Sequence, residues 1–264
     1  MKLAILKRVT QSLTLALLIA IPLLNKGGID VLMGSLYSLA IGPLWITDPL
    51  SGLQVILTTH SAGATLLISM SLPIVFALIF GRIFCGWMCP QNALSELFDF
   101  LSQKVGFERP VRLSPTSWPR YVVLAVMLAL TSIAGFPAAN LISAPGIISV
   151  QISESIMSGA VGVELWLIGA IIVVEFFLVR RAWCNYVCPV GGLLSIFRIA
   201  RTMKVSYGKE TEQCIKCGQC VKACQLGLNP MGGKIIYPLC HNCGDCIAAC
   251  QRATGKNNPL SFRF

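Results

Sequence analysis

Long apolar runs alternate with polar segments along the first three quarters of the chain. Four of these runs come close to the roughly 20 apolar residues that a helix needs to cross a bilayer. They cover residues 9–24, 61–81, 121–138 and 161–179. The pattern therefore predicts four transmembrane helices arranged as two hairpins. A signal peptide is the alternative for the first run, but no small-residue cleavage site follows it.

Two further apolar stretches, 31–47 and 139–153, are interrupted by glycine and proline and do not reach the length of a span. Such interruptions are typical of irregular backbone. We expect two loops that dip into the membrane or lie on it. Each stretch lies between the two helices of a hairpin, so the chain is predicted to consist of two similar halves.

Composition and charge place the chain in a membrane. Hydrophobic residues make up 55% of the 264 residues and charged residues only 12%, against about 25% charged residues in soluble domains. The net charge of +10 would also fit nucleic acid, but 20 of the 21 Lys and Arg residues lie in 1–8, 82–120 and 180–264, and the other is Lys26. Cytoplasmic loops carry such an excess. We therefore expect a multi-pass protein of the bacterial inner membrane, with both termini cytoplasmic and no nucleic-acid partner.

The polar tail carries the strongest chemical signal. The spacing C-x-x-C-x-x-C-x-x-x-C occurs twice, and this is the pattern of bacterial ferredoxins with two 4Fe–4S clusters. Three thiolates two residues apart wrap one cube, and the fourth reaches the other cube. Cluster one should therefore use Cys214, Cys217, Cys220 and Cys250, and cluster two Cys240, Cys243, Cys246 and Cys224.

The alternatives for these cysteines fit less well. Zinc sites use two C-x-x-C pairs rather than two runs of four, and disulfides are disfavoured in the cytoplasm. The proline that usually follows the fourth cysteine is replaced by Gln225 and Gln251. We predict two domains: residues 1–197 form the mainly α, four-helix transmembrane domain, and residues 198–264 form a small α+β ferredoxin domain.

A second pair of cysteine motifs stands at the ends of two spans. The stretches "RIFCGWMCP" (82–90) and "RAWCNYVCP" (181–189) align without a gap at an offset of 99 residues, which indicates an internal repeat. A proline can begin a helix, and a thiol before a helix start has a lowered pKa; Arg82 and Arg181 should favour the thiolate further.

We therefore expect the two pairs to converge in one site between the membrane and the tail, formed by Cys85, Cys89, Cys184 and Cys188. Four thiolates could hold a tetrahedral soft metal or another iron–sulfur centre. Two dithiols could instead cycle as disulfides. The sequence leaves these options open.

Three other polar residues are candidates for proton chemistry. His60, at the non-cytoplasmic end of the second predicted span, could act as the base that a quinol needs, although a histidine at a membrane interface is also ordinary. Glu175 lies inside the fourth span, where an ionisable residue suggests function; an ion pair with Arg180 is the alternative. Asp48 could accept a proton, but Asp-Pro is first a turn signal. A haem role is disfavoured because no C-x-x-C-H occurs.

Taken together, the four spans, the two C-x-x-x-C-P signatures, the double-cluster tail and the segments "LKRVTQSL" and "LWITDPL" resemble the NapH family. A related membrane module occurs in MauN, NosR and CcoG. The resemblance implies a quinol dehydrogenase subunit that passes electrons from the quinol pool through iron–sulfur clusters to a NapG-like iron–sulfur partner in nitrate respiration. The alternative is a NosR- or CcoG-like copper reductase or assembly protein.

Overall fold

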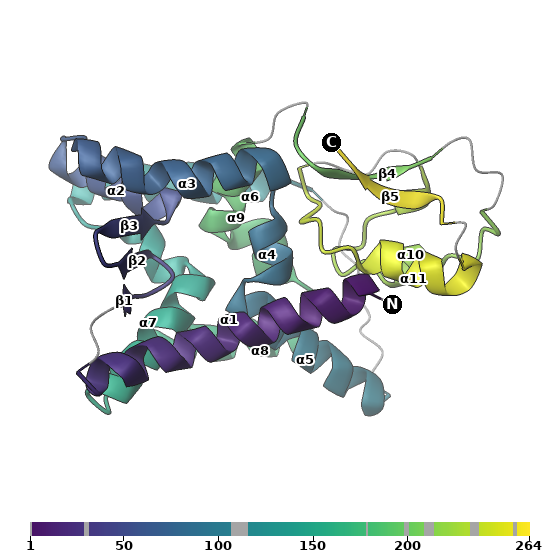
Figure 1. Ribbon diagram of the computed structural model, residues 1–264, viewed down its shortest axis with the longest axis horizontal. Coiled ribbons are helices and arrows are strands. Elements are labelled where there is room, and N and C mark those ends of the chain that lie inside the picture. The colour runs from purple at the N-terminus through teal and green to yellow at the C-terminus, as the bar shows by residue number, and fades with distance from the viewer. Residues whose placement is uncertain are drawn as a thin grey trace.

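The computed structural model of the chain describes residues 2–28, 32–106, 116–177, 179–197, 201–208, 214–232, 238–255 and 258–264. It is mostly helical, as predicted. A helical body is followed at one end by a small tail that combines strands and helices (Figure 1).

Four apolar helices correspond to the four predicted spans: α1 (Lys2–Lys26), α3 (Ala64–Phe80), α6 (Trp118–Ala134) and α8 (Leu165–Phe177). Of the described residues, only Leu3–Lys26 form a helix that is long and apolar enough by itself to cross a membrane. Helices α3 and α6 have 17 residues and α8 has 13, which correspond to about 26 and 20 Å at 1.5 Å per residue. The four transmembrane helices therefore stay a prediction.

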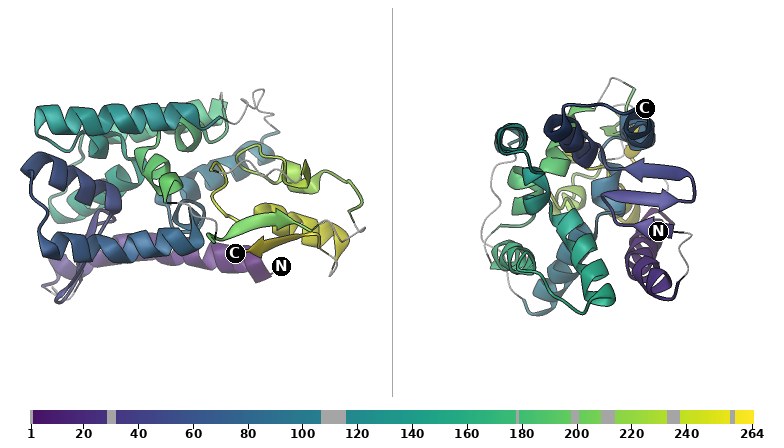
Figure 2. Two further views of the ribbon diagram at one scale, coloured as in Figure 1. Left: turned by 90° about the horizontal axis from the view of Figure 1, so that it is seen from above. Right: turned by 90° about the vertical axis from the view of Figure 1, so that its left-hand side faces the viewer.

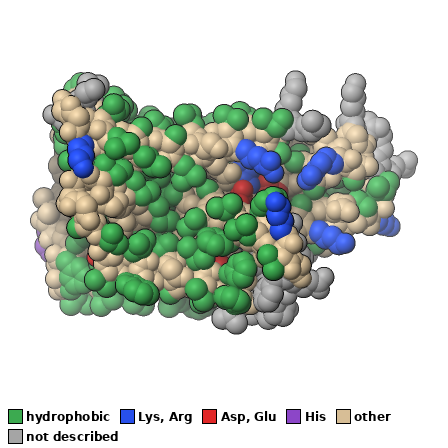
Figure 3. All heavy atoms as spheres, turned by 90° about the horizontal axis from the view of Figure 1, so that it is seen from below, with side chains coloured by type: hydrophobic (Ala, Val, Ile, Leu, Met, Phe, Trp, Pro, Cys, Tyr) green, Lys and Arg blue, Asp and Glu red, His purple; other side chains and the backbone are tan. Residues whose placement is uncertain are grey.

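The outward faces of these four helices are apolar. Examples are Val9, Ile68, Ile133 and Trp166, which are 57%, 67%, 83% and 81% exposed. In the space-filling view, hydrophobic side chains cover most of the visible body, and most of the visible basic side chains lie towards the tail (Figure 3). Contiguous apolar surface of this kind is rare on soluble monomers and marks a surface that binds lipid or protein.

The prediction of two irregular loops is wrong. In the first stretch, β1 (Leu32–Gly34), β2 (Ser38–Ile41) and β3 (Leu44–Thr47) form an antiparallel sheet in that order, while residue 31 lies outside the described residues. The backbone groups are thus paired within the sheet, and Gly42 takes the positive φ of 56° that the β2–β3 turn requires.

The second stretch is also regular. A short 3₁₀ turn, η1 (Ala138–Ile142), leads into α7 (Ala144–Met157), with Pro145 in its first turn. A proline there is compatible with a helix because the first turn needs no intrahelical N–H partner. Gly146 accommodates the ring of Tyr37, which joins α7 to the sheet.

Along the chain, α2 (Pro49–Thr59) follows the sheet and precedes α3. The Asp48 carboxylate caps this helix by accepting hydrogen bonds from the amides of Leu50 and Ser51, both at 3.1 Å. The Asp-Pro pair therefore begins a helix. As the cysteine motifs predict, prolines also begin α5 (Pro90–Lys104) and α9 (Pro189–Ile196), which follow α4 (Ile83–Trp87) and the π-helical turn η2 (Trp183–Val187).

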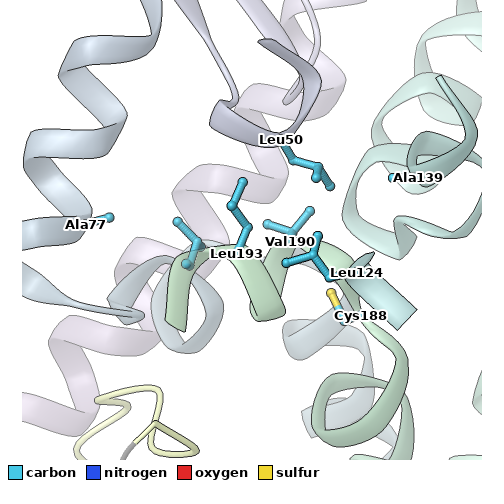
Figure 4. Close-up of a cluster of buried hydrophobic side chains, with 8 residues drawn as sticks. Leu50, Ala77, Leu124, Ala139, Cys188, Val190 and Leu193 are labelled. Carbon is cyan, nitrogen blue, oxygen red and sulfur yellow. The ribbon is translucent and has the colours of Figure 1, made fainter. Parts of the chain in front are cut away.

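The largest apolar cluster of the body surrounds α9. Val190 and Leu193 of this helix pack with Leu50 of α2 and Leu124 of α6, and Cys188 lies at the edge of the same cluster (Figure 4). One thiol of the C-x-x-x-C-P motifs is therefore part of the hydrophobic core.

The tail pairs β4 (Lys204–Tyr207) with β5 (Leu260–Arg263) as antiparallel neighbours, with α10 (Gln219–Lys222), the 3₁₀ turn η3 (Pro230–Gly232) and α11 (Asp245–Thr254). This agrees with a small α+β unit. The predicted boundary at 197/198 falls at residues 198–200, which lie outside the described residues. Both chain termini lie at the tail end of the molecule (Figures 1 and 2).

Candidate iron–sulfur sites

The structure brings the two C-x-x-x-C-P motifs together. Cys89 has Cys85 and Cys188 as electrostatic neighbours, and Cys184 has Cys188 and Cys89. These pairs join the four thiols in one group: Cys89 and Cys188 immediately precede α5 and α9, and Cys85 and Cys184 lie in α4 and η2. We call this group, Cys85, Cys89, Cys184 and Cys188, the four-cysteine site.

Burial controls the protonation of these thiols. It raises the pKa of Cys188 to about 11, and the amides of Val190 and Gly191 and the guanidinium of Arg82 offset this effect only in part. Burial likewise raises the pKa of Cys89. The expectation that helix starts and arginines lower the pKa is therefore wrong for the free thiols of Cys89 and Cys188. A metal that binds here must displace their protons.

Two arginines connect the repeats crosswise. Arg181 donates from Nη1 to the carbonyl oxygen of Asn92 at 3.3 Å. Arg82, its equivalent in the first repeat, places Nη2 only 2.8 Å from where a Cβ atom on Gly191 would lie. Positions 92 and 191 are also equivalent at the offset of 99. Each half thus sends its arginine to the same point of the other half, which is how a pseudo-twofold pair is arranged.

The other predicted site residues lie in different surroundings. Glu175 is buried and accepts hydrogen bonds from Ser95 Oγ at 2.6 Å and the Trp183 amide at 3.3 Å. It is an electrostatic neighbour of Cys184. Among the described residues, Arg180 forms its ion pair with Asp99 at 3.0 Å and not with Glu175 as suggested. His60 is exposed, with a left-handed backbone at the end of α2, and is not brought to the four-cysteine site.

In the tail, the two cysteine runs share one backbone shape. The third and fifth positions have positive φ in both: Lys216 and Gly218 in the first run, Asn242 and Gly244 in the second. Each glycine stands immediately before the short helix that carries the third cysteine, α10 or α11. Successive backbone turns of this type direct amides inward around an anionic group.

The tail cysteines gather into two groups. Cys224 of the first run lines one cavity with Cys240, Cys243 and Cys246 of the second; this cavity holds about 380 Å³ of space, part of it open to solvent. Cys250 of the second run has Cys214 and Cys217 of the first as electrostatic neighbours, and Cys220 has Cys250 and Cys214. These are the two sets that the spacing predicts for crossed ligation.

The arrangement of the tail cysteines favours clusters over single metal ions. Within the described residues, no group of three or more His, Cys, Asp or Glu side chains is arranged to hold a single metal ion. A single ion draws its ligands close because a metal–thiolate bond is about 2.3 Å, whereas a cube has its irons at separate corners and needs a wider set. A cavity lined by four cysteines, closed by Leu226, Leu228 and Val205, fits a thiolate-bound cluster.

The first repeat is in direct contact with the second cysteine run. Arg82 donates from Nη1 to the carbonyl oxygens of Pro238 at 3.1 Å and Leu239 at 3.0 Å. Trp87 Nε1 donates to the carbonyl oxygen of Asn242 at 3.0 Å. These bonds hold α4 against the loop that precedes Cys243.

Gly86 lies at this contact between the first repeat and the second cysteine run, which we call the Gly86 junction. A Cβ atom there would lie 2.9 Å from the carbonyl oxygen of His241 and 3.1 Å from both Cα and Cβ of Cys243. Cys85 of the four-cysteine site is thus one residue away from backbone that touches a predicted ligand of cluster two. The sequence offers one signal for this contact: position 86 is glycine, whereas the equivalent position 185 is asparagine.

Gln225, which stands where ferredoxins usually have proline, belongs to a polar network between the tail and the body. Lys7 of α1 pairs with Glu96 of α5 at 2.7 Å and with Asp245 of α11 at 2.9 Å. Gln225 Nε2 donates to the same two carboxylates, at 2.8 Å to Glu96 and 2.5 Å to Asp245. The glutamine that replaces the usual proline therefore anchors the tail to the body.

A model of a family described as "4Fe-4S binding domain" matches residues 62–108 and 162–205. The two matched segments contain the two C-x-x-x-C-P motifs, so they also support the internal repeat. This comparison defines the chain as an iron–sulfur protein.

The relatives define the family more closely. The ferredoxin-type protein MauN of methylamine utilization from Methylorubrum extorquens is 30% identical over 83% of this chain and 73% of its own length. The ferredoxin-type protein NapH of Escherichia coli is 26% identical over 83% and 74%. The chain belongs to this family of ferredoxin-type proteins, which confirms the resemblance. The regulatory protein NosR of Pseudomonas aeruginosa is 29% identical over 75% of the chain but 26% of its own length. No solved structure matches the chain.

Replacing Gly86 with alanine is expected to loosen the junction. The added methyl group would meet backbone atoms of the second cysteine run, and overpacking of this kind costs about 1–3 kcal/mol. We expect slower reduction of the tail and a changed electron paramagnetic resonance (EPR) spectrum of cluster two. Gly169→Ala in α8 is the matched control, because a Cβ atom there meets nothing within 4 Å. Equal behaviour of the two variants would contradict the contact.

Proposed function

We propose that the protein is the membrane electron-transfer subunit of a quinol dehydrogenase, and that it passes electrons to a NapG-like iron–sulfur partner in nitrate respiration. The observation that carries this proposal is the Gly86 junction. It joins the four-cysteine site of the body to the Cys240–Cys246 group of the tail through touching backbone. A body that only anchored the tail would not need cysteines at this contact.

The placement of the body in the inner membrane is part of the proposal. Apolar outward faces on α1, α3, α6 and α8 support it, because such faces are stable in lipid. The excess of Lys and Arg in the segments next to the tail supports a cytoplasmic tail. Both termini lie at that same end (Figure 1), so the arrangement is compatible with four spans.

The four-cysteine site is proposed to hold an iron–sulfur centre. Two observations favour this option over a dithiol pair. The family model described as a 4Fe–4S binding domain covers these motifs, and burial holds the thiols of Cys89 and Cys188 protonated when they are free. A dithiol needs an accessible thiolate in order to react.

The redox balance fixes what the chain must provide. Quinol loses two electrons and two protons and becomes quinone, and iron–sulfur clusters accept electrons one at a time. The body buries Cys89 and Cys188 of the four-cysteine site, and the junction leads to the Cys224, Cys240, Cys243 and Cys246 group. The other tail group is nearer to solvent: Cys217 is exposed and Ile215 is 65% exposed. We propose that the partner receives electrons there.

The protons need an acceptor near the site of oxidation. Of the three candidates from the sequence, Glu175 is buried and lies in electrostatic reach of Cys184. His60 is exposed at the end of α2, and Asp48 accepts the capping hydrogen bonds at the start of the same helix. Position therefore favours Glu175 as the residue that takes a proton from quinol.

The proposal is tested by adding a quinol to the purified protein in detergent or nanodiscs and following cluster reduction by EPR and visible absorbance. We expect about eight irons per chain from the two tail clusters, further iron at the four-cysteine site, and quinol-dependent reduction of the tail. No reduction of assembled clusters, with or without the partner, would overturn the proposal. Reduction of added Cu(II) in preference to the partner would favour the copper-reductase alternative.

A further inference from the structure

Arg120, in the first turn of α6, is buried without a partner. Its relative exposure is 0%, and none of its three side-chain nitrogens, Nε, Nη1 and Nη2, has a hydrogen-bond acceptor among the described residues. A buried guanidinium with nothing to receive its five N–H groups is strongly unfavourable. The protein must supply an anion at this point, or the arginine would not be tolerated.

The surroundings of Arg120 show which anion. Its electrostatic neighbours include Cys85 and Cys188, one from each repeat, and also Arg82. Arg82 is itself 5% exposed, and its Nε has no acceptor among the described residues. The third nearby arginine, Arg181, is already paired with Asp99 at 3.2 Å. Two guanidinium charges next to the thiols therefore have no carboxylate partner within the described chain.

The geometry points to Arg120, together with Arg82, as the counter-ion pair of an anionic metal–thiolate centre at the four-cysteine site. Four thiolates around a metal core of charge 2+ carry about two net negative charges, which two guanidinium groups balance. Arg120 is a positioning residue: it stabilises the centre, and most of all its reduced, more negative form. This inference rests on the proposed function, which places a metal centre here.

Removing Arg120 should change the unfolding temperature in opposite directions with and without the centre. With the centre present, Arg120→Met should lower the unfolding temperature, because it removes the counter-charge. In a Cys85→Ser/Cys188→Ser background, which cannot form the centre, the same change should raise the unfolding temperature, because an unpaired buried charge is then removed. Arg8→Met, at an exposed position of α1, is the control and should change little in either background.

A second measurement uses the potential of the centre. In an EPR-monitored redox titration, Arg120→Gln should lower the midpoint potential of the four-cysteine centre, or abolish its assembly while the tail clusters stay intact, and Arg120→Lys should lie closer to wild type. The counter-ion role of Arg120 is contradicted if Arg120→Met destabilises both backgrounds alike, as it would if a lipid phosphate were the partner. It also fails if Arg120→Gln retains the centre at an unchanged potential. Wild-type protein without iron at this site would instead refute the proposed centre itself.

Discussion

Replacing Cys188 with serine should abolish quinol-dependent reduction of the tail while the tail retains its iron. Serine is a poor ligand for iron–sulfur centres, and Cys188 is 8% exposed within the main apolar cluster, so no solvent ligand can easily replace it. We expect loss of the iron of the four-cysteine site and at least a hundredfold slower reduction, about 3 kcal/mol in the barrier. Dithionite should still reduce the tail clusters.

A control in the same cluster separates chemistry from packing. Leu193→Ala removes more apolar volume from α9, at a cost of about 2–5 kcal/mol of stability, but leaves all four thiols in place. We expect it to unfold at a lower temperature and still to transfer electrons. If Cys188→Ser transferred electrons at the wild-type rate, the four-cysteine site would lie off the electron path.

Each tail cluster should take its fourth ligand from the cysteine run that supplies the other three ligands of the other cluster. Cys250→Ala is expected to remove cluster one, and Cys224→Ala cluster two, each with a loss of about four irons per chain. The reason is spatial: Cys250 lies near Cys214 and Cys217, and Cys224 lies in the cavity of Cys240, Cys243 and Cys246.

Double variants make this expectation sharp. Under crossed ligation, Cys214→Ala combined with Cys250→Ala removes no more iron than either change alone, whereas Cys240→Ala with Cys250→Ala removes both clusters. Ligation of each cluster by its own run predicts the reverse. Gln251→Ala, next to Cys250 in α11, should lose no iron. Iron analysis and spin quantitation by EPR decide between the two patterns.

The predictions from sequence succeeded where the signal was local. The spacing of the tail cysteines is a property of a few consecutive residues, and so is the proline that begins α5 or α9. The apolar runs gave the four long helices, although their ends shift by a few residues. The prediction of two loops failed because periodicity in short apolar segments interrupted by glycine and proline does not distinguish a strand or a helix from irregular backbone. Pairing with neighbours, not the segment itself, made β1, β2 and β3 regular.

The long-range contacts could not be predicted in the same way. Gly86 lies against Cys243, and Gln225 bridges Glu96 and Asp245; these partners are far apart in the sequence, and no pattern along the chain connects them. In the sequence, Arg120 is one of 21 Lys and Arg residues and nothing marks it out. Its isolation becomes visible only when burial and partners are known.

The glycine at position 86 also makes the two repeats unequal at equivalent positions, 86 and 185. A body built from two equivalent halves would offer two equivalent surfaces to the tail, one on each repeat. At the second repeat the corresponding residue is Asn185, buried in the π-helical turn η2, which carries a side chain where Gly86 has none. Asparagine at position 86 should therefore push the first repeat and the second cysteine run apart, because even a Cβ atom there would lie 3.1 Å from Cα and Cβ of Cys243.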